Sequence, residues 1–202
     1  MKCICIGRNY AKHIEELGNE KPSEPVIFLK PDTAVLRNND PFYHPSFSKD
    51  IHHEVELLVK IKKEGKSIAP EFVSNYFDEI GLGIDFTARD KQSELKSKGL
   101  PWELAKAFNQ SAVISRFLSK SDFNLEDINF RLEVNNTLAQ EGNTNQMIFS
   151  INEIISFVSK YFTLKTGDII FTGTPSGVGP VKVGDRLSGY IKQQKLLDFE
   201  VK

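Results

Sequence analysis

The clearest pattern in the chain is the alternation of apolar and polar residues over positions 51–59. The residue types there are those of a buried strand, in which successive side chains point to opposite faces. Glu54 and Glu56 therefore share one face, where neighbouring side chains stand about 7 Å apart. Two explanations remain open: a solvated edge strand, or a buried strand whose carboxylates are protonated, paired with cations or bound to a divalent metal ion.

A second strand pattern, over residues 79–87, carries one more carboxylate. Its even-numbered residues are apolar and face a core, whereas Asp85 shares the other face with Gly81 and Gly83. Glycines within a strand often mark the approach of a ligand, so we expect these two to open space beside Asp85. Three carboxylates without a thiol or imidazole pattern suit Mg²⁺ or Mn²⁺, and a metal site becomes a serious alternative to the solvated edge.

The rest of the chain predicts further strands and a few short helices. Further strand patterns lie at residues 1–6, 26–31, 131–134, 137–140 and 169–172. The third and fourth of these are joined by a predicted hairpin turn at Asn135-Asn136. The first predicted helix starts at residue 10, with Asn9 as its N-cap and Gly18 as its stop. A second helix follows a capping box formed by Ser150 and Glu153.

Composition limits the class of protein. The 202 residues are enough for one well-filled core, and no linker or repeat divides them, so we expect a single domain over 1–202. The net charge of −1 and the scattered basic residues argue against a nucleic-acid partner. No apolar run has the length of a signal sequence or membrane span, so we expect a soluble, cytoplasmic protein without membrane contact. Cys3 and Cys5, on one face of the first strand, are expected to be reduced and packed.

Two further features are candidates for chemistry. His13 and Glu16 lie three residues apart on the first predicted helix, where the carboxylate can orient the imidazole, although such pairs are usually surface contacts. The segment 173–180 is rich in glycine and proline and can bring backbone amides close to an anion. It lacks the Gly-Lys-Ser/Thr ending of a phosphate-binding loop, and most segments of this composition are only turns.

Five motifs occur in order along the chain: Gly7–Tyr10, His52–Glu56, Asp85–Asp90, Gly99–Lys106 and Phe171–Pro175. Together they resemble the fumarylacetoacetate hydrolase family over essentially the whole chain. The likeness is greatest to its short, single-domain branch, which includes acylpyruvate hydrolases and oxaloacetate decarboxylases or tautomerases. The resemblance implies an α+β, mostly β fold, in which a mixed β-sheet roll or sandwich carries short peripheral helices, and it implies a homodimer.

The resemblance also implies a set of site residues around a Mg²⁺ or Mn²⁺ ion. The implied metal ligands are Glu54, Glu56 and Asp85, the implied catalytic residues are His13, Glu16 and Lys106, and the implied substrate contacts are Arg8, Arg89, Gln92 and Thr174. In that family the helix that carries the histidine is often mobile and settles over the site when ligand binds.

For function, the resemblance implies a small 2-oxo acid substrate. The main expectation is a hydrolase that cleaves a carbon–carbon bond in 3-acylpyruvates through an enolate stabilised by the ion, with His13 and Glu16 activating water. Lys106 would offset charge on the substrate oxygen, and Thr174 would hold the substrate carboxylate. The alternatives are an oxaloacetate decarboxylase or keto-enol tautomerase at the same site, or a non-catalytic member that only binds an oxo acid. The sequence does not rank the three reactions.

Overall fold

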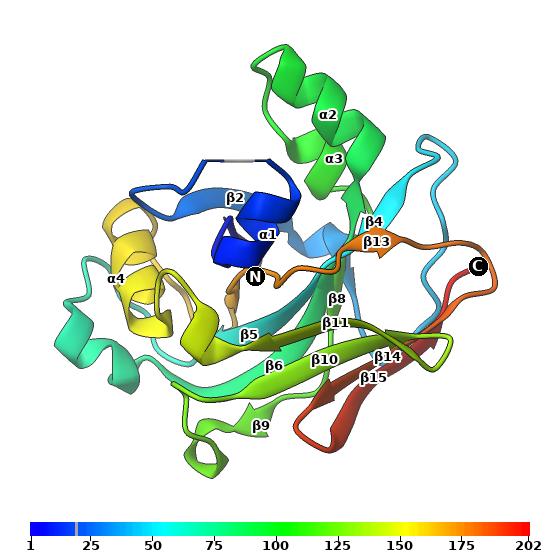
Figure 1. Ribbon diagram of the computed structural model, residues 1–202. Coiled ribbons are helices and arrows are strands. Elements are labelled where there is room, and N and C mark those ends of the chain that lie inside the picture. Colours follow the sequence, from blue (N-terminus) through cyan, green and yellow to red (C-terminus); the bar gives the residue numbers. More distant parts are fainter. Residues whose placement is uncertain (19) are drawn as a thin grey trace.

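The computed structural model describes residues 1–18 and 20–202, and its largest element is a curved mixed sheet (Figure 1). The strands in spatial order are β2 (Val26–Pro31), β1 (Lys2–Gly7), β12 (Ile169–Phe171), β5 (Val55–Ile61), β6 (Phe77–Asp85), β8 (Ala112–Ile114) and β3 (Val35–Leu36), with β9 (Leu118–Ser119) paired to β6. The β1–β12 and β3–β8 pairs are parallel, and the other pairs of this sheet are antiparallel.

Two smaller sheets make the fold mostly β, as the family resemblance implied. They contain β11 (Thr137–Asn143), β10 (Asn129–Val134), β14 (Arg186–Ile191) and β15 (Gln194–Glu200) in one sheet, and β13 (Gly179–Pro180), β4 (Ile51–His53) and β7 (Thr87–Ala88) in the other. The β10–β11 hairpin turns at Asn135 and Asn136, whose φ angles of 52° and 64° lie in the left-handed region that asparagine tolerates. The predicted hairpin is confirmed.

The main core lies between the large sheet and the four-stranded sheet. Fully buried leucines from both sheets belong to it: Leu57, Leu82, Leu132 and Leu197. Gly189 of β14 permits the close approach of the sheets, because a Cβ there would lie 2.8 Å from Leu82 Cδ2. Burial of each such leucine contributes about 1.5–3 kcal/mol, so this layer supplies much of the stability that holds the site in place.

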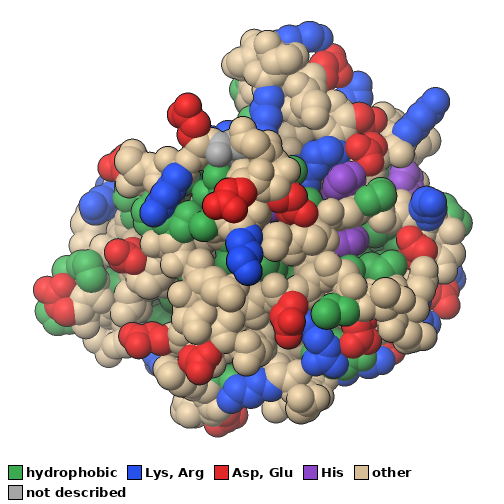
Figure 2. Space-filling model, in the orientation of Figure 1, with side chains coloured by type: hydrophobic (Ala, Val, Ile, Leu, Met, Phe, Trp, Pro, Cys, Tyr) green, Lys and Arg blue, Asp and Glu red, His purple; other side chains and the backbone are tan. Residues whose placement is uncertain are grey.

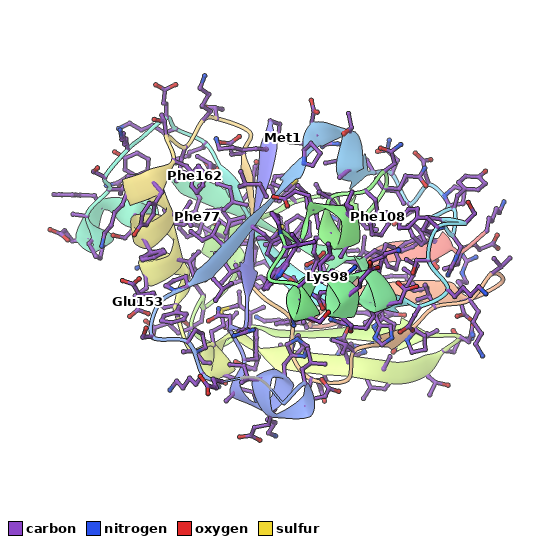
Figure 3. All side chains as sticks on the ribbon, turned by 90° about the horizontal axis from the view of Figure 1, so that it is seen from above. Met1, Phe77, Lys98, Phe108, Glu153 and Phe162 are labelled. Atoms are coloured by element: carbon purple, nitrogen blue, oxygen red, sulfur yellow. The ribbon has the colours of Figure 1, made fainter. Side chains whose placement is uncertain are left out.

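Short helices lie around the sheets: α1 (Ala11–Glu16), α2 (Arg89–Ser97), α3 (Glu103–Lys106) and α4 (Ile151–Tyr161), together with the 3₁₀ turns η1 (Asp32–Ala34), η2 (Pro70–Asn75), η3 (Lys120–Asp122) and η4 (Thr144–Gln146). From above, α2 lies beside α3, with Lys98 just beyond the end of α2 and Phe108 just beyond α3 (Figure 3). In the described ranges no helix has the length and apolar character needed to cross a membrane.

The capping box that was predicted for α4 is confirmed. Ser150 Oγ accepts a hydrogen bond from the Glu153 backbone N–H at 3.3 Å, and Glu153 Oε2 accepts one from the Ser150 backbone N–H at 2.8 Å. The N-cap prediction for α1 is wrong. Tyr10 holds that position, because the Asn9 side chain is drawn into three bonds with the backbone of Phe149 and Thr172. Asn9 therefore anchors the start of α1 to β12.

The outer face of the large sheet carries a second apolar cluster, which includes Cys3, Cys5, Leu58 and Phe171. Both cysteines are free and fully buried, as expected. Since side chains alternate along β5, Glu56 lies on the same face as Leu58, two positions closer to the strand's start. The acidic residues thus continue the face of this second cluster.

The prediction that Gly81 and Gly83 open space for a ligand is wrong. A Cβ at Gly81 would meet the ring of Phe117 at 3.0 Å, and a Cβ at Gly83 would meet Leu58 at 2.9 Å and the Val113 carbonyl oxygen at 2.7 Å. The space beside the two glycines is filled by Phe117 and Leu58 of the second apolar cluster and by the Val113 backbone. The glycines serve packing, and the site lies farther along the strands.

Candidate active site

Three carboxylates converge where β5 begins and β6 ends. Oxygen atoms of Glu54, Glu56 and Asp85 lie within 4.8 Å of one another, and the residues are 4%, 2% and 0% exposed. The predicted continuous strand over 51–59 is interrupted at Glu54, which lies between β4 and β5. There the Glu54 carbonyl accepts a bond from the Asp85 backbone N–H at 2.8 Å. Glu56 pairs in register with Gly83, two residues before Asp85, and this pairing sets the three side chains together.

Two of the predicted cationic residues contact this triad. Lys106 Nζ lies 2.8 Å from Glu54 Oε2 and 2.7 Å from Asp85 Oδ2, and it donates a third bond to Thr87 Oγ1 at 2.6 Å. Arg89 donates to Glu54 Oε1 at 2.6 Å. The short helices α2 and α3, which follow β7, carry these two residues over the end of the sheet (Figure 1).

A third cation, Lys30, was not predicted. Its side chain is 0% exposed, its Nζ lies 2.6 Å from Asp85 Oδ1, and it donates to the backbone oxygens of Phe86 and Ser111 at 3.2 and 2.8 Å. The sequence held one signal for it, since Lys30 is the only charged residue within the apolar run that forms β2. A buried lysine needs a partner of opposite charge.

The charges on the triad are unevenly compensated. Burial alone would raise the pKa of Glu54, but Lys106 and Arg89 hold that pKa below its ordinary value. Burial, together with the charges of Asp85 and Glu54, raises the pKa of Glu56 well above its ordinary value. Among the described residues, no side-chain cation pairs with Glu56, and its Oε2 accepts one bond, from the Gly173 backbone N–H at 2.7 Å. The ionised form of Glu56 is therefore disfavoured in the metal-free protein, because no cation compensates its charge.

These residues fit a divalent metal ion. Three buried carboxylate oxygens within reach of one another form a hard oxygen donor set, and a bound cation would supply the compensation that the Glu56 carboxylate lacks. Mg²⁺ and Mn²⁺ prefer such ligands in an octahedron, so three protein oxygens would leave positions for waters or substrate oxygens.

The predicted histidine pair lies against the same cavity. His13 Nδ1 and Glu16 Oε2 are 3.1 Å apart, and the Glu16 Oε1 atom accepts a bond from the Gly177 backbone N–H at 3.0 Å. His13 is buried and lines the cavity that the triad also lines. With Nδ1 occupied by Glu16, the other ring nitrogen, Nε2, is left for proton exchange.

The cavity measures about 40 Å³ and gathers every predicted site residue except Glu16, which supports His13. Its lining consists of Ile6, Gly7, Arg8, His13, Leu17, Phe28, Glu54, Glu56, Asp85, Arg89, Gln92, Lys96, Trp102, Lys106 and Thr174. A larger groove of about 610 Å³ lies elsewhere, between Arg37 and Leu197, but it lacks a cluster of carboxylates. The small cavity is therefore the candidate active site. In Figure 2, histidine, acidic and basic side chains gather over β4 and β13.

The polar residues of the lining are held in defined orientations. Arg89 Nη1 donates to Gln92 Oε1 at 2.6 Å, which leaves the Gln92 amide N–H groups available to a ligand. Gln140, which no sequence motif indicated, donates to Thr174 Oγ1 at 2.9 Å from outside the cavity. Lys96 was also missed, because it lies in a lysine-rich stretch that reads as a solvated helix face.

Comparisons with known proteins agree with this arrangement. The family model described as fumarylacetoacetate (FAA) hydrolase C-terminal matches residues 2–202. The chain is 45% identical over 199 residues to the mitochondrial oxaloacetate tautomerase of Bos taurus, covering 98% of this chain and 90% of that protein. It is 45% identical over 185 residues to the mitochondrial oxaloacetate decarboxylase of Dictyostelium discoideum, covering 91% and 85%.

Solved structures show the same fold. A crystal structure of fumarylpyruvate hydrolase from Pseudomonas aeruginosa in complex with Mn²⁺ and pyruvate has a TM-score of 0.94 and 35% identity, covering 100% of this chain and 89% of that one. The match extends over the strands that bring Glu54, Glu56 and Asp85 together. The chain therefore belongs to the fumarylacetoacetate hydrolase family and is an enzyme of that family.

Proposed function

We propose that the protein converts a small 2-oxo acid at a Mg²⁺ or Mn²⁺ ion held by Glu54, Glu56 and Asp85. One observation carries the proposal: the three carboxylates and the His13–Glu16 pair line or support a single buried cavity. When bound, the ion would act as a Lewis acid toward a 2-oxo acid that chelates it through its carboxylate and keto oxygens. The protein's own residues would then transfer the proton.

His13 is the proposed base. Its Nδ1–H donates to Glu16, so its Nε2 carries a lone pair that can take a proton from the carbon next to the keto group. The Glu16 carboxylate, which faces Nδ1, would stabilise the imidazolium that results. Return of this proton to oxygen converts the keto form of the substrate into its enol, and the reverse transfer restores the keto form. Lys106 offsets the negative charge that develops on the substrate oxygen.

The charge at the cavity favours a dianionic substrate. Arg8 and Lys96 both line it, and neither has an ion-pair partner among the described residues. Burial lowers the pKa of Lys96, as do the nearby charges of Arg8, Arg89 and Lys106, which is evidence for crowded positive charge. A second carboxylate on the substrate would relieve this repulsion. Oxaloacetate has that carboxylate, and we propose its keto-enol tautomerisation as the activity, consistent with the name of the 45% identical relative from Bos taurus.

Hydrolysis of 3-acylpyruvates is the second candidate, and decarboxylation of oxaloacetate would use the same residues. The His13–Glu16 pair suits hydrolysis as well, because the same base can activate water for attack on the distal carbonyl. The fumarylpyruvate hydrolase with a TM-score of 0.94 supports it as well. From the sequence we further propose a single-domain, cytoplasmic protein, and, as the resemblance implies, a homodimer.

A parallel assay ranks the three reactions. Purified protein with Mg²⁺ or Mn²⁺ is supplied with oxaloacetate in its keto and enol forms, acetylpyruvate and fumarylpyruvate, and each product is followed separately. His13→Ala should abolish tautomerisation and hydrolysis while sparing much of any metal-driven decarboxylation. Lys12→Ala, an exposed change on the same helix, is the control and should leave all rates unchanged. Equal rates for His13→Ala and the wild type on every substrate would exclude His13 as the base.

A further inference from the structure

The side-chain amide of Gln140 links the strand β5, which begins next to Glu54, to the loop that carries Thr174, and it does so from outside the cavity. Gln140 lies on β11 and is 1% exposed. Its Oε1 accepts bonds from the Val55 backbone N–H and from His53 Nδ1, both at 2.9 Å. Its Nε2 donates to Thr174 Oγ1 at 2.9 Å and to the Pro175 carbonyl oxygen at 3.0 Å. All four hydrogen-bonding positions of the amide are thus used.

Two backbone groups fix the orientation of this amide, because each can act only as a hydrogen-bond donor or only as an acceptor. The Val55 N–H can only donate, so the atom facing it is the amide oxygen. The Pro175 carbonyl can only accept, so the atom facing it is the amide nitrogen. The Thr174 hydroxyl, which faces the same nitrogen, must therefore be the acceptor in its bond with Gln140.

This bond determines where the Thr174 hydroxyl hydrogen points. The oxygen already accepts from Gln140, so the hydroxyl hydrogen is available to a different acceptor. Within the described residues its other neighbour is the Pro175 carbonyl oxygen, which is 3.5 Å away and already receives a shorter bond from Gln140. Thr174 is 4% exposed and lines the cavity beside the triad. The hydroxyl is left as a donor toward a ligand in that cavity.

We propose that Gln140 is a positioning residue that holds the Thr174 hydroxyl as a hydrogen-bond donor to the carboxylate of the 2-oxo acid. This role rests on the proposed function and assigns a specificity determinant to it. A fixed donor favours an anionic oxygen and disfavours a ligand that presents a donor at that point. Because Gln140 also holds the Val55 N–H, it keeps the loop of Thr174 in register with the strand that begins beside Glu54.

A double-mutant cycle tests the coupling between the two residues. Gln140→Met removes the amide at similar size, Thr174→Val removes the hydroxyl, and Thr174→Ser keeps it as the control. The readouts are the dissociation constant of pyruvate in the presence of Mn²⁺, measured by calorimetry, and kcat and KM for oxaloacetate. Each single variant should weaken pyruvate binding by about 10- to 100-fold, and KM should rise more than kcat falls. In the Thr174→Val background, Gln140→Met should change pyruvate binding by less than about twofold.

Opposite results overturn the assignment. If Gln140→Met leaves pyruvate affinity unchanged, or weakens it by the same factor in both backgrounds, Gln140 does not act through Thr174. If Gln140 had a purely structural role, Gln140→Met would lower the free energy of unfolding equally in the wild-type and Thr174→Val backgrounds. Its effect on pyruvate binding would then not depend on Thr174. If the wild type binds no pyruvate with Mn²⁺ and converts no oxo acid, the proposed function itself fails and the role of Gln140 fails with it.

A second variant covers the case in which Gln140→Met does not fold. Gln140→Glu keeps an acceptor for Val55 and His53, but the group that faces Thr174 loses its donor when ionised. Its loss of pyruvate affinity relative to the wild type at the same pH should grow as the pH rises. Equal affinity of this variant and the wild type at every pH would also contradict the proposal.

Discussion

Glu16 accepts a hydrogen bond from the Gly177 backbone N–H at 3.0 Å, and this contact ties α1 to the loop that carries Thr174. The other oxygen of the same carboxylate faces His13 Nδ1 at 3.1 Å. Glu16, which would orient His13 as the proposed base, is therefore itself oriented by the loop of Thr174. The contact of α1 with this loop and the orientation of the His13 ring are thus coupled through one carboxylate.

Glu16→Gln should lower the rate of oxaloacetate tautomerisation by about 10- to 1000-fold, because a neutral amide stabilises the imidazolium of His13 far less than a carboxylate does. Glu15→Gln, one residue away on the exposed side of α1, is the matched control and should stay within about twofold of the wild type. Steady-state kinetics at saturating Mg²⁺ measure both. Equal rates for the two variants would mean that Glu16 does not orient the base.

Lys96→Ala should raise KM for oxaloacetate by up to about fivefold and change KM for the monoanion acetylpyruvate less, since Lys96 is proposed to meet the second carboxylate. Lys98→Ala is the matched control, because Lys98 lies at the end of the same helix and pairs with Glu94 at 2.8 Å. The comparison uses the ratio of the two KM values in each variant. An unchanged ratio in Lys96→Ala would remove the argument for a dianionic substrate.

Lys30→Met should destabilise the metal-free protein by about 3–5 kcal/mol, because it removes the buried cation beside Asp85 Oδ1 and leaves that carboxylate with Lys106 on its other oxygen. Lys60→Met breaks the half-exposed pair with Glu79 and should cost no more than about 1 kcal/mol. Urea unfolding of both variants measures this difference. Mn²⁺ should restore more stability to Lys30→Met than to the wild type if the ion and Lys30 both compensate the triad. Equal stabilisation of both proteins would argue against that compensation.

The raised pKa of Glu56 gives the metal-free protein a definite pH dependence. Above the ordinary carboxyl pKa of 4.5, the folded protein keeps a proton on Glu56 that the unfolded chain releases, so stability falls as pH rises toward the raised value. Glu54, whose pKa is lowered, acts in the opposite direction, and its contribution is lost only as pH falls below 4.5. Thermal unfolding across this range, with and without Mg²⁺, measures the slope. Glu56→Gln should remove the decline above pH 4.5, and an unchanged decline would show that another group causes it.

Features set by local periodicity could be predicted from the sequence. Strand alternation predicted that Glu54 and Glu56 lie together, and they do, although β5 begins only at Val55. Ser150 and Glu153 form a capping box because their spacing is that of a helix start. Asn9 shows where a local rule fails. Asparagine is a good N-cap residue, but the Asn9 side chain instead forms hydrogen bonds with residues about 140 and 163 positions away in the chain.

Residues that depend on distant partners could not be predicted in this way. The role of Lys30 depends on its ion pair with Asp85, and the role of Gln140 depends on its hydrogen bond to Thr174. Only the folded sheets bring these pairs together. The space beside Gly81 was misjudged for the same reason, since Phe117 fills it from another part of the chain. The family motifs compensated for part of this gap, because they carry information on the three-dimensional site that periodicity does not contain.

The central claim is that the ion held by Glu54, Glu56 and Asp85 is required for conversion of a 2-oxo acid. The most direct measurement is the rate of oxaloacetate keto-enol interconversion by the same protein sample before chelation, after removal of the ion and after Mg²⁺ or Mn²⁺ is restored. The rate should fall to the uncatalysed level on removal and recover on restoration. Full activity of the metal-free protein on oxaloacetate would contradict the account.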